Sequence, residues 1–444
     1  MVLPWHLSPD INASGLDAAT LSQAANLTRS RSECYAPENG AWVHNPNATA
    51  PYPQVDARAA TEKRCSTPTW RWTWHSTSEA RTGSLSCPAV AGIAPTRAEM
   101  CEAFRGERLL IIGDSMQQQL FFSLGALMVG PSFKTCTRAP KKCPTVPDPV
   151  TGAATTTYWA NPQDTEDMSA HFVACDGRAE VRFIFSPRLA FAFEPASNDT
   201  LSDCAAALAA ETAQELCPRC GRTTNDLSPT TQRGTNISAS PFNRSFPSRC
   251  EGRDQRMAFN WECEVASRHW TVLLLNTGLW WTKKVRDCFG SPRWFEVFND
   301  TLVSTARMVA RHSHPRRRVF YSTTPLPHTN CANHQRPVVD YFDEVYDAEL
   351  DKFQWIHVAF LDGIAASAFR RHVPEVTILN LAAMASLRPD GHARAVGNED
   401  CVHYCRPGPV DGMSGELVRK LHAARSSEEG QQRVKASRGQ TGLK

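Results

Sequence analysis

The chain has 444 residues, of which 41% are hydrophobic, so it can bury a substantial core and is not intrinsically disordered. Its 48 basic and 45 acidic residues give a formal net charge of only +3, which excludes the strongly basic footprint of a typical nucleic-acid-binding protein. We therefore expect a globular protein of one large domain or two smaller ones, with no nucleic acid among its partners.

The N-terminal part of the chain differs in composition from the rest. Residues 1–33 are polar and irregular, which predicts a flexible segment. Residues 34–101 are rich in Cys, Trp and Pro, as in "TWRWTW", and show little helical periodicity. We interpret residues 34–101 as an extended subdomain that disulfides pin onto a larger body.

The stretch "RLLIIGDSMQQQLFFSLGALM" at 108–128 predicts a strand, a tight turn and a helix. Its first five residues are typical of a buried parallel strand. Apolar residues then recur at helical spacing, namely Met116, Leu120, Leu124 and Leu127. Ser115 would lie at the start of this helix, where unpaired amides and the helix dipole stabilise an oxyanion. The simpler alternative is that Ser115 or Asp114 only caps the helix.

The remaining elements indicate an α/β fold. Residues 171–185 predict two strands around the turn Asp176-Gly177, and residues from about 195 to 260 indicate a surface insertion rich in disulfides. Three later segments predict strands: 270–281, 317–325 and 375–381. A helix is predicted at 339–355, with Phe342, Tyr346, Leu350 and Phe353 on one face. Such alternation predicts a mostly parallel sheet with helices on both faces and functional loops at the carboxyl ends of its strands.

We assign residues 102–424 to one domain that carries the insertion, and residues 425–444 to a disordered tail, because the tail has almost nothing to bury. No run approaches the roughly 18 apolar residues that a membrane span needs.

The cysteines favour an oxidising compartment. There are sixteen, spread along the chain, and a cytosolic protein seldom carries so many scattered thiols. Seven Asn-x-Ser/Thr sequons agree with a secretory route: Asn12, Asn26, Asn47, Asn198, Asn236, Asn243 and Asn299. The alternative use of Cys217 and Cys220 as a zinc knuckle has no second ligand pair nearby, so we predict no metal site.

The beginning of the chain conflicts with this compartment. The start "MVLPWHLSPDINASGLD" lacks a charged region followed by an apolar one, as a signal peptide would have. We expect that a signal or anchor is missing from this chain, through truncation or an incorrect gene start. Any membrane association would depend on that anchor.

A nucleophilic serine needs a base, and the base needs a group that orients it. The segment 398–412, "NEDCVHYCRPGPVDG", supplies both in Asp400 and His403, whose spacing of three would place them on one side of a helical turn. Cys401 and Cys405 bracket the histidine and would hold this loop if each is bridged elsewhere.

A second histidine and carboxylate occur in "RPDGH" at 388–392. Asp390 and His392 are two residues apart, a spacing less suited to a mutual contact. We interpret this segment as a turn that shapes the entrance of the site.

The oxyanion would need donors besides the Ser115 amide. Candidates are Gly113 at the strand end, the side chain of Asn276 and the amide of Gly278. Asn276 could equally be a turn-stabilising residue. Trp280 and Trp281 could stack on sugar rings, although paired tryptophans are more often core residues.

These segments together resemble a known family. In chain order they are Cys34, "GAWV", Cys65, "WRW", "RGERLLIIGDS", "NTGLWW", "RPDGH" and "DCVHYCRPG". From about Cys34 to about Lys420 the chain resembles the trichome-birefringence-like proteins of the PC-esterase group, within the SGNH/GDSL hydrolase superfamily. The resemblance implies an SGNH-type three-layer α/β/α catalytic domain and a polysaccharide O-acetyltransferase of the Golgi lumen, or a related sialic-acid or glycan acetyltransferase.

The resemblance also implies roles for three residues. Ser115 would be the nucleophile, and Asp400 and His403 the other triad members. An acetyl donor, acetyl-CoA or another, would be a co-substrate rather than a bound cofactor, and a glycan would be the acceptor. Hydrolysis of carbohydrate acetyl esters by the same triad is the alternative, and a non-catalytic glycan-binding module is a third.

The chain departs at six positions from the residues that plant members of this family usually carry. Gln118 and Gln119 replace an arginine and an asparagine, Tyr404 a tryptophan, Leu279 a histidine, and Met413 and Ser414 a tryptophan and an asparagine. Triad chemistry survives these changes, but the identity of the acceptor glycan does not follow from the resemblance.

Overall fold

A computed structural model describes the protein at residues 40–44, 46–47, 50–51, 71–76, 94–130, 133, 145–147, 154–156, 158–159, 169–186, 189, 261–266, 268–281, 286, 291–393 and 400–441. The predicted flexible segment 1–33, the insertion at about 195–260 and the pair Cys217 and Cys220 lie outside these ranges.

The central feature is a seven-stranded sheet in the order β11-β10-β9-β3-β8-β7-β6. The strands are β3 Glu107–Gly113, β6 Tyr158–Trp159, β7 Ser169–Ala174, β8 Ala179–Phe185, β9 Val272–Leu275, β10 Arg318–Ser322 and β11 Thr377–Leu379. The five strands from β11 to β8 pair in parallel. β7 pairs antiparallel with β8, and β6 pairs antiparallel with β7. The predicted mostly parallel sheet is confirmed.

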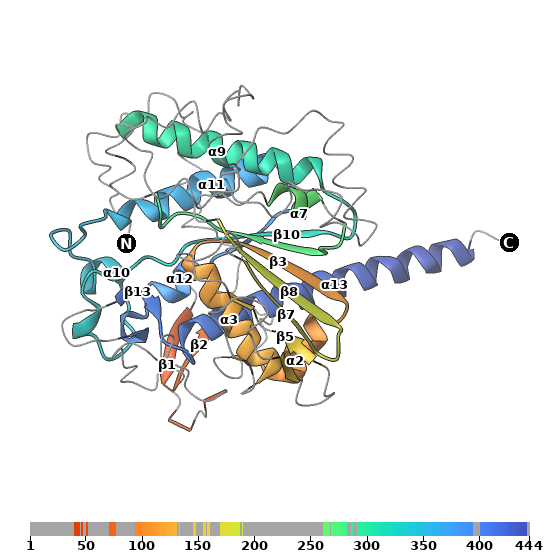
Figure 1. The fold of residues 1–444 in the computed structure, drawn as a ribbon, viewed down its shortest axis with the longest axis horizontal. Coiled ribbons are helices and arrows are strands. Elements are labelled where there is room, and N and C mark those ends of the chain that lie inside the picture. Colours follow the sequence, from red (N-terminus) through yellow and green to blue (C-terminus); the bar gives the residue numbers. More distant parts are fainter. Residues whose placement is uncertain are drawn as a thin grey trace.

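Helices cover both faces of this sheet (Figure 1). On one side lie α2 Arg97–Ala103, α3 Ser115–Val129, α12 Leu381–Ala385 and α13 Pro409–Thr441. On the other lie α7 Glu262–Ala266, α9 Ser291–Arg311 and α11 Val358–His372. Side chains of β3 alternate between the two cores, because Leu109 and Ile111 join the first and Leu110 and Ile112 the second. The architecture is the three-layer α/β/α arrangement that the sequence predicts.

The predicted hairpin at 171–185 is confirmed as β7 and β8, with a longer turn than expected. Cys175, Asp176 and Gly177 all have positive φ angles, of 56°, 62° and 76°. The side chain of Arg178 closes this turn by donating to the carbonyl of Cys175 (3.0 Å). Beyond the central sheet, β4 Thr145–Pro147 pairs with β5 Ala154–Thr156.

The described part of the N-terminal extension contacts the body. Strands β1 Gly40–His44 and β2 Trp72–Ser76 form an antiparallel pair. The Trp42 indole N–H donates to the carbonyl of Met384 (3.0 Å), and the Arg388 guanidinium lies 4.4 Å from the Trp42 ring centroid. The domain boundary expected at residue 101 falls inside α2, which packs on α3 and α13.

The long helix predicted at 339–355 is wrong. Within this range the only α-helix is α10 Tyr341–Glu344; turns follow it, and a 3-10 helix begins at Trp355. The carboxylates of Asp347 and Asp351 accept hydrogen bonds from amides two to five residues ahead, and such local bonds compete with the helix ladder. Phe353 is consequently half exposed rather than aligned on a buried face.

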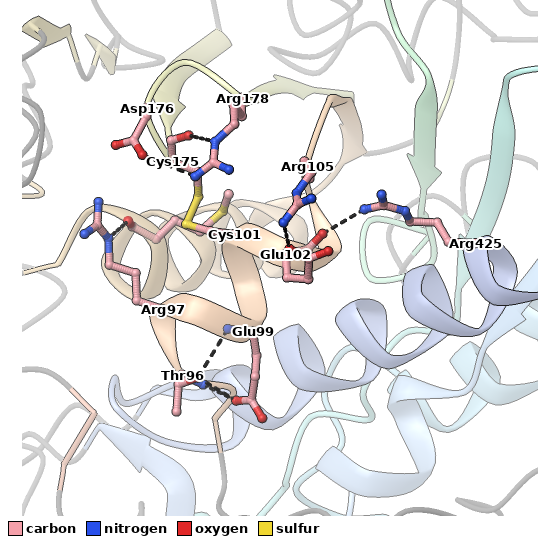
Figure 2. The surroundings of a disulfide bond; sticks show 11 residues. Thr96, Arg97, Glu99, Cys101, Glu102, Arg105, Cys175, Asp176, Arg178 and Arg425 are labelled. Atoms are coloured by element: carbon pink, nitrogen blue, oxygen red, sulfur yellow. Dashed lines mark hydrogen bonds and ion pairs between the residues drawn. A yellow bond between two sulfur atoms is a disulfide. The ribbon is translucent and has the colours of Figure 1, made fainter. Parts of the chain in front are cut away.

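The tail expected to be disordered is helical through residue 441, because α13 continues through it. Its first part packs on α3, and Arg425 donates to the carbonyl of Glu102 at the base of α2 (2.7 Å, Figure 2). Extending such a helix costs far less than nucleating one, and the tail contains good helix formers such as Glu, Gln, Lys and Ala. The last turns project away from the body (Figure 1). None of the helices described here is both long and apolar enough to cross a membrane.

Candidate active site

The structure brings the three predicted triad residues into one hydrogen-bonded chain. Ser115 begins α3 directly after β3, and its Oγ lies 2.8 Å from Nε2 of His403. The other ring nitrogen, Nδ1, lies 2.9 and 3.0 Å from the two carboxylate oxygens of Asp400. A carboxylate only accepts, so Nδ1 carries the proton and Nε2 is free to accept the Ser115 hydroxyl proton. Side chains of His403 and Asp400 are 32% and 21% exposed, which leaves the chain open to a substrate.

The loop that holds Asp400 and His403 is not the helical turn predicted from their spacing. It is strand β13 Asp400–Tyr404, paired with β12 His392–Ala393. Adjacent residues His392 and Ala393 of β12 pair with Tyr404 and Asp400 of β13, so the residues between Asp400 and Tyr404 have no partner in β12 and form a bulge. One Asp400 oxygen also accepts from the amides of Val402 and His403 (3.3 and 3.1 Å). This bulge and turn place two residues that an ideal strand would direct to opposite faces on the same side.

Gln119 fixes β13 against α3, the helix that begins with Ser115. It lies one helical turn after Ser115, is buried, and forms two hydrogen bonds with the backbone of Tyr404. Its Nε2 donates to the Tyr404 carbonyl (2.9 Å), and its Oε1 accepts from the Tyr404 amide (3.0 Å). Gln119 is one of the departures from the plant pattern, and its sequence position gave no signal of this role.

Asp114 caps α3 and is fully buried beside the triad. Its carboxylate accepts from the Met116 amide (2.9 Å), as the capping alternative predicted. Burial raises the pKa of this carboxyl to about 6, against the lowering effects of the Met116 amide and of His403. Its second oxygen has no hydrogen-bond partner among the described residues. Ser115 is therefore not the cap, and its hydroxyl is left for His403.

The candidate oxyanion residues differ in what they can donate. Both N–H groups of the buried Asn276 amide are engaged, by the Ser322 carbonyl and the Thr324 hydroxyl (both 2.8 Å), which favours the structural alternative for this side chain. Gly278 has φ +153°, and a Cβ there would lie 2.9 Å from the Thr324 hydroxyl. Gly113 has even less room for a side chain, since a Cβ there would lie 2.5 Å from the Gln117 side chain.

Trp280 and Trp281 differ in their exposure to solvent. Trp281 is 2% exposed and packs edge-on against Phe298 in the core, so it cannot stack on a sugar. Trp280 is half-buried and lies edge-on to Phe185. Only Trp280 remains a candidate for glycan contact.

The "RPDGH" segment is a buried support, not a turn at the entrance. Arg388 and Asp390 form a fully buried bidentate ion pair with distances of 2.8 and 2.9 Å. His392 is 2% exposed, and its Nδ1 lies 2.9 Å from the carbonyl of His403. His392 therefore contacts the backbone of His403, the candidate base.

A disulfide anchors the same loop. Cys401 is bonded to Cys331, as the bracketing cysteines suggested, and Cys405 is also disulfide-bonded. A second disulfide, Cys101–Cys175, joins α2 to the β7–β8 turn (Figure 2). That turn precedes the first residues of β8, which pair with the start of β3, so this bridge lies at the opposite end of the strand from Ser115.

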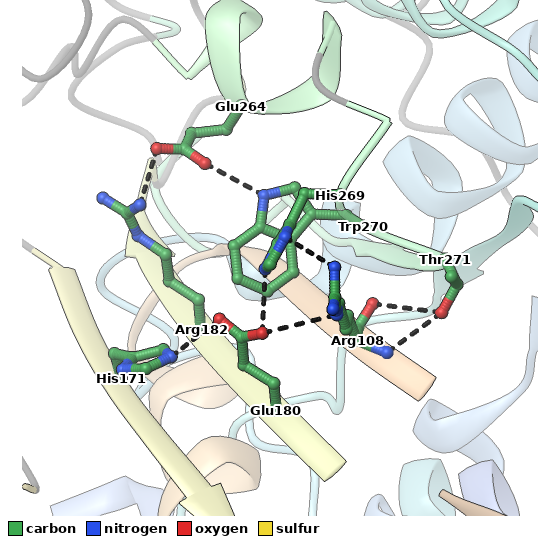
Figure 3. A network of polar contacts seen from close by, with 8 residues as sticks. All are labelled: Arg108, His171, Glu180, Arg182, Glu264, His269, Trp270 and Thr271. Carbon is green, nitrogen blue, oxygen red and sulfur yellow. Dashed lines mark hydrogen bonds and ion pairs between the residues drawn. The ribbon is translucent and has the colours of Figure 1, made fainter. Parts of the chain in front are cut away.

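The same remote end carries a second cluster of histidines and carboxylates (Figure 3). Glu180 accepts from His171 and His269 at 2.9 and 2.8 Å, and Arg108 lies beside it. Although burial raises the pKa of Glu180, these histidines lower it to about 2. No group of three or more His, Cys, Asp or Glu within the described ranges is arranged to hold a metal ion.

Comparison with known families agrees with this geometry. Residues 255–418 match the PC-Esterase family, described as a GDSL/SGNH-like acyl-esterase family found in Pmr5 and Cas1p. The chain contains a PC-Esterase domain. This is an acyl-esterase-like enzyme family, and the match implies acyl-esterase or acyltransferase-type activity for this domain. No curated protein matches the chain.

The match covers only part of the site. Asp400 and His403 lie inside residues 255–418, whereas Ser115 and the strand before it lie outside. Because β3 pairs in parallel with β9, which lies inside the match, Ser115 at the end of β3 lies next to the PC-Esterase domain. The central sheet therefore extends N-terminally beyond the match.

Replacing Asp114 with Asn should make stability less dependent on pH. In the wild type the folded state holds the Asp114 proton up to about pH 6, whereas the unfolded state loses it near 3.8. Stability should therefore fall by about 3 kcal/mol between acid and neutral pH from this group alone. Urea unfolding across this range should show that Asp114→Asn gains on the wild type as pH rises. A difference that stays constant with pH would contradict the assignment.

The disulfides Cys331–Cys401 and Cys101–Cys175 provide a matched pair of variants. Their sequence separations are 70 and 74 residues, so removing either by Cys→Ser substitution at both positions should cost a similar amount of stability, about 4 kcal/mol. Only loss of Cys331–Cys401 should reduce turnover by the PC-Esterase domain in protein shown to be folded, since it releases the Asp400 loop. Equal effects of both pairs on turnover would show that this bridge has no positional role.

Proposed function

We propose that the protein is a glycan O-acetyltransferase that works through a Ser115-linked acetyl-enzyme. The observation that carries this proposal is the continuous chain from Asp400 through His403 to Ser115, at the carboxyl end of a parallel strand and accessible to solvent. An intact, connected triad argues against a module that only binds glycans, because binding alone needs none of these contacts.

In the first step, His403 Nε2 takes the Ser115 hydroxyl proton as Oγ attacks the acetyl carbonyl. The Asp400 carboxylate stabilises the imidazolium through the Nδ1 proton that it already holds. The resulting oxyanion lies near the N-terminus of α3, where the Ser115 amide and the amide of Gly278 are the proposed donors. His403 then protonates the leaving group, and the acetyl group remains on Ser115.

In the second step, a sugar hydroxyl gives its proton to His403 and attacks the acetyl-enzyme. The acetyl–Ser115 bond breaks, a new ester forms on the sugar, and the proton returns to Ser115. Support for a sugar acceptor comes from the resemblance to polysaccharide O-acetyltransferases and from the partly exposed Trp280 near the site. The donor, acetyl-CoA or another activated acetyl ester, is part of the proposal.

A second candidate is hydrolysis of carbohydrate acetyl esters, which the acyl-esterase description of the matched family favours. It shares the first step, and water replaces the sugar in the second. The disulfides indicate an oxidising compartment, and we propose the secretory pathway, in particular the Golgi lumen, as the place where the protein meets its glycan.

Transfer is tested by incubating the purified protein with an activated acetyl ester, with and without candidate glycans, and measuring acetylated glycan by mass spectrometry. We expect acetylated glycan from the wild type, and a loss of roughly 10³-fold or more in Ser115→Ala and His403→Ala with glycan affinity nearly intact. Asp400→Asn should be almost as severe because the imidazole loses its orientation.

Ser123→Ala is the matched control. Ser123 lies two turns further along α3, and its hydroxyl bonds to Asp411 (2.6 Å) away from the triad. Its activity should match the wild type. Free acetate as the sole product, at a rate that no glycan changes, would replace transfer by hydrolysis. Full activity in Ser115→Ala would remove the triad assignment.

A further inference from the structure

Two buried histidines form a hydrogen-bonded pair behind the catalytic loop. His328 Nδ1 lies 2.5 Å from His392 Nε2, and both side chains are at most 2% exposed. The outer nitrogen of His328 lies 2.8 Å from the carbonyl of Ser386. The outer nitrogen of His392 lies 2.9 Å from the carbonyl of His403. The pair therefore ends on a carbonyl group at both sides.

Counting protons decides the charge of this pair. A carbonyl oxygen can only accept, so each outer nitrogen must carry a proton. If both rings were neutral, the two inner nitrogens would then have only lone pairs, and lone pairs repel at 2.5 Å. Any other neutral arrangement turns a nitrogen lone pair toward one carbonyl oxygen. Three protons on the four nitrogens satisfy all three contacts, which gives the pair one excess proton.

Some neighbouring groups raise the pKa of the two histidines and others lower it. Burial lowers the pKa of both rings, to about 4 for His392, and His334 and Arg388 add to this effect at His328. Burial therefore opposes any charge on the pair and excludes a second one in neutral solution, whereas the hydrogen-bond geometry requires the first. The carboxylates of Asp400 and Asp390 and the two carbonyl contacts favour the single proton, although His403 opposes it. Tyr404 stacks on His392 with ring centroids 4.3 Å apart, and Tyr341 packs on His328 at 5.6 Å.

We propose that His328 and His392 share one proton and act as a positioning pair for the base His403. The charged pair donates to the His403 carbonyl, while Asp400 accepts from the His403 amide (3.1 Å). The peptide groups on both sides of His403 are thus held by charged partners, whose hydrogen bonds are stronger than neutral ones. The catalytic consequence rests on the proposed function, whereas the shared proton does not.

The shared proton is tested by nuclear magnetic resonance of wild-type protein labelled with ¹⁵N in its histidines, with signals assigned by comparison with His392→Asn. We expect three protonated nitrogens and one unprotonated nitrogen in this pair near neutral pH, with a strongly deshielded proton between the rings. Two unprotonated nitrogens in the pair would overturn the proposal. This result does not depend on whether any acetyl ester is turned over.

The positioning role is tested by steady-state kinetics with an activated acetyl ester. His392→Leu should lower kcat by about 10- to 100-fold with little change in KM, because misplacing the base by about 1 Å has effects of this size. His392→Asn keeps an N–H donor toward the His403 carbonyl and should recover part of the loss. His372→Leu, at the far end of α11, is the control and should behave as the wild type.

Folded His392→Leu protein with a wild-type kcat would overturn the positioning role. If the wild type itself shows no turnover, the proposed function fails, and the proton count still decides whether the pair is charged.

Discussion

The site depends on one contact between distant parts of the chain, the hydrogen bond from Ser115 Oγ to His403 Nε2. These residues are 288 positions apart, and the contact holds only if β13 lies at a fixed distance from the start of α3. Three independent devices secure that distance: the two hydrogen bonds of Gln119, the Cys331–Cys401 bridge and the buried support from His392. Each acts on the backbone or covalent frame of β13, so the imidazole itself stays free to move a proton.

The two ends of the sheet are built differently. At the remote end, Glu180 and its histidine and arginine neighbours satisfy one another, and a disulfide ties the turn to α2. At the Ser115 end, three buried oxygens have no hydrogen-bond partner in the described part of the chain: Asp114 Oδ2, Gln117 Oε1 and Asn276 Oδ1. Unpaired buried polar atoms cost stability, and the pKa of about 6 at Asp114 expresses part of that cost. Unpaired buried atoms also occur at the remote end, at Arg318 Nε and Nη1, so the ends differ in the unpaired atoms they carry: oxygen acceptors lie near Ser115 and guanidinium donors near Glu107.

The sequence predicts most of the frame because the signals there are periodic. The buried run before Ser115, the helical spacing after it and the hairpin around Asp176-Gly177 each depend on local residues and are confirmed, although the turn of the hairpin is longer than predicted. The predicted helix at 339–355 fails because aspartates within it bond to nearby amides, an effect that apolar spacing does not show. The prediction of a disordered tail is wrong for the opposite reason, since the packed helix α13 continues through residues whose composition is polar.

The sequence predicts which side chains lie together at the candidate site, but not the residues that hold them there. Ser115, Asp400 and His403 could be predicted as neighbours because a nucleophile, a base and an orienting carboxylate can come from only a few residue types. Gln119 and the His328–His392 pair support the loop through backbone contacts, which many residue types could make and no spacing announces. Trp281 illustrates the reverse error, because an aromatic side chain beside a site can equally fill the core.

The proposed nucleophilic role of Ser115 is tested most directly by peptide mass spectrometry after brief exposure of the native protein to an activated acetyl ester. We expect a mass increase of one acetyl group on the Ser115 peptide, absent in His403→Ala and discharged faster when a suitable glycan is added. An unmodified Ser115 in folded protein, under conditions that consume the ester, would contradict it.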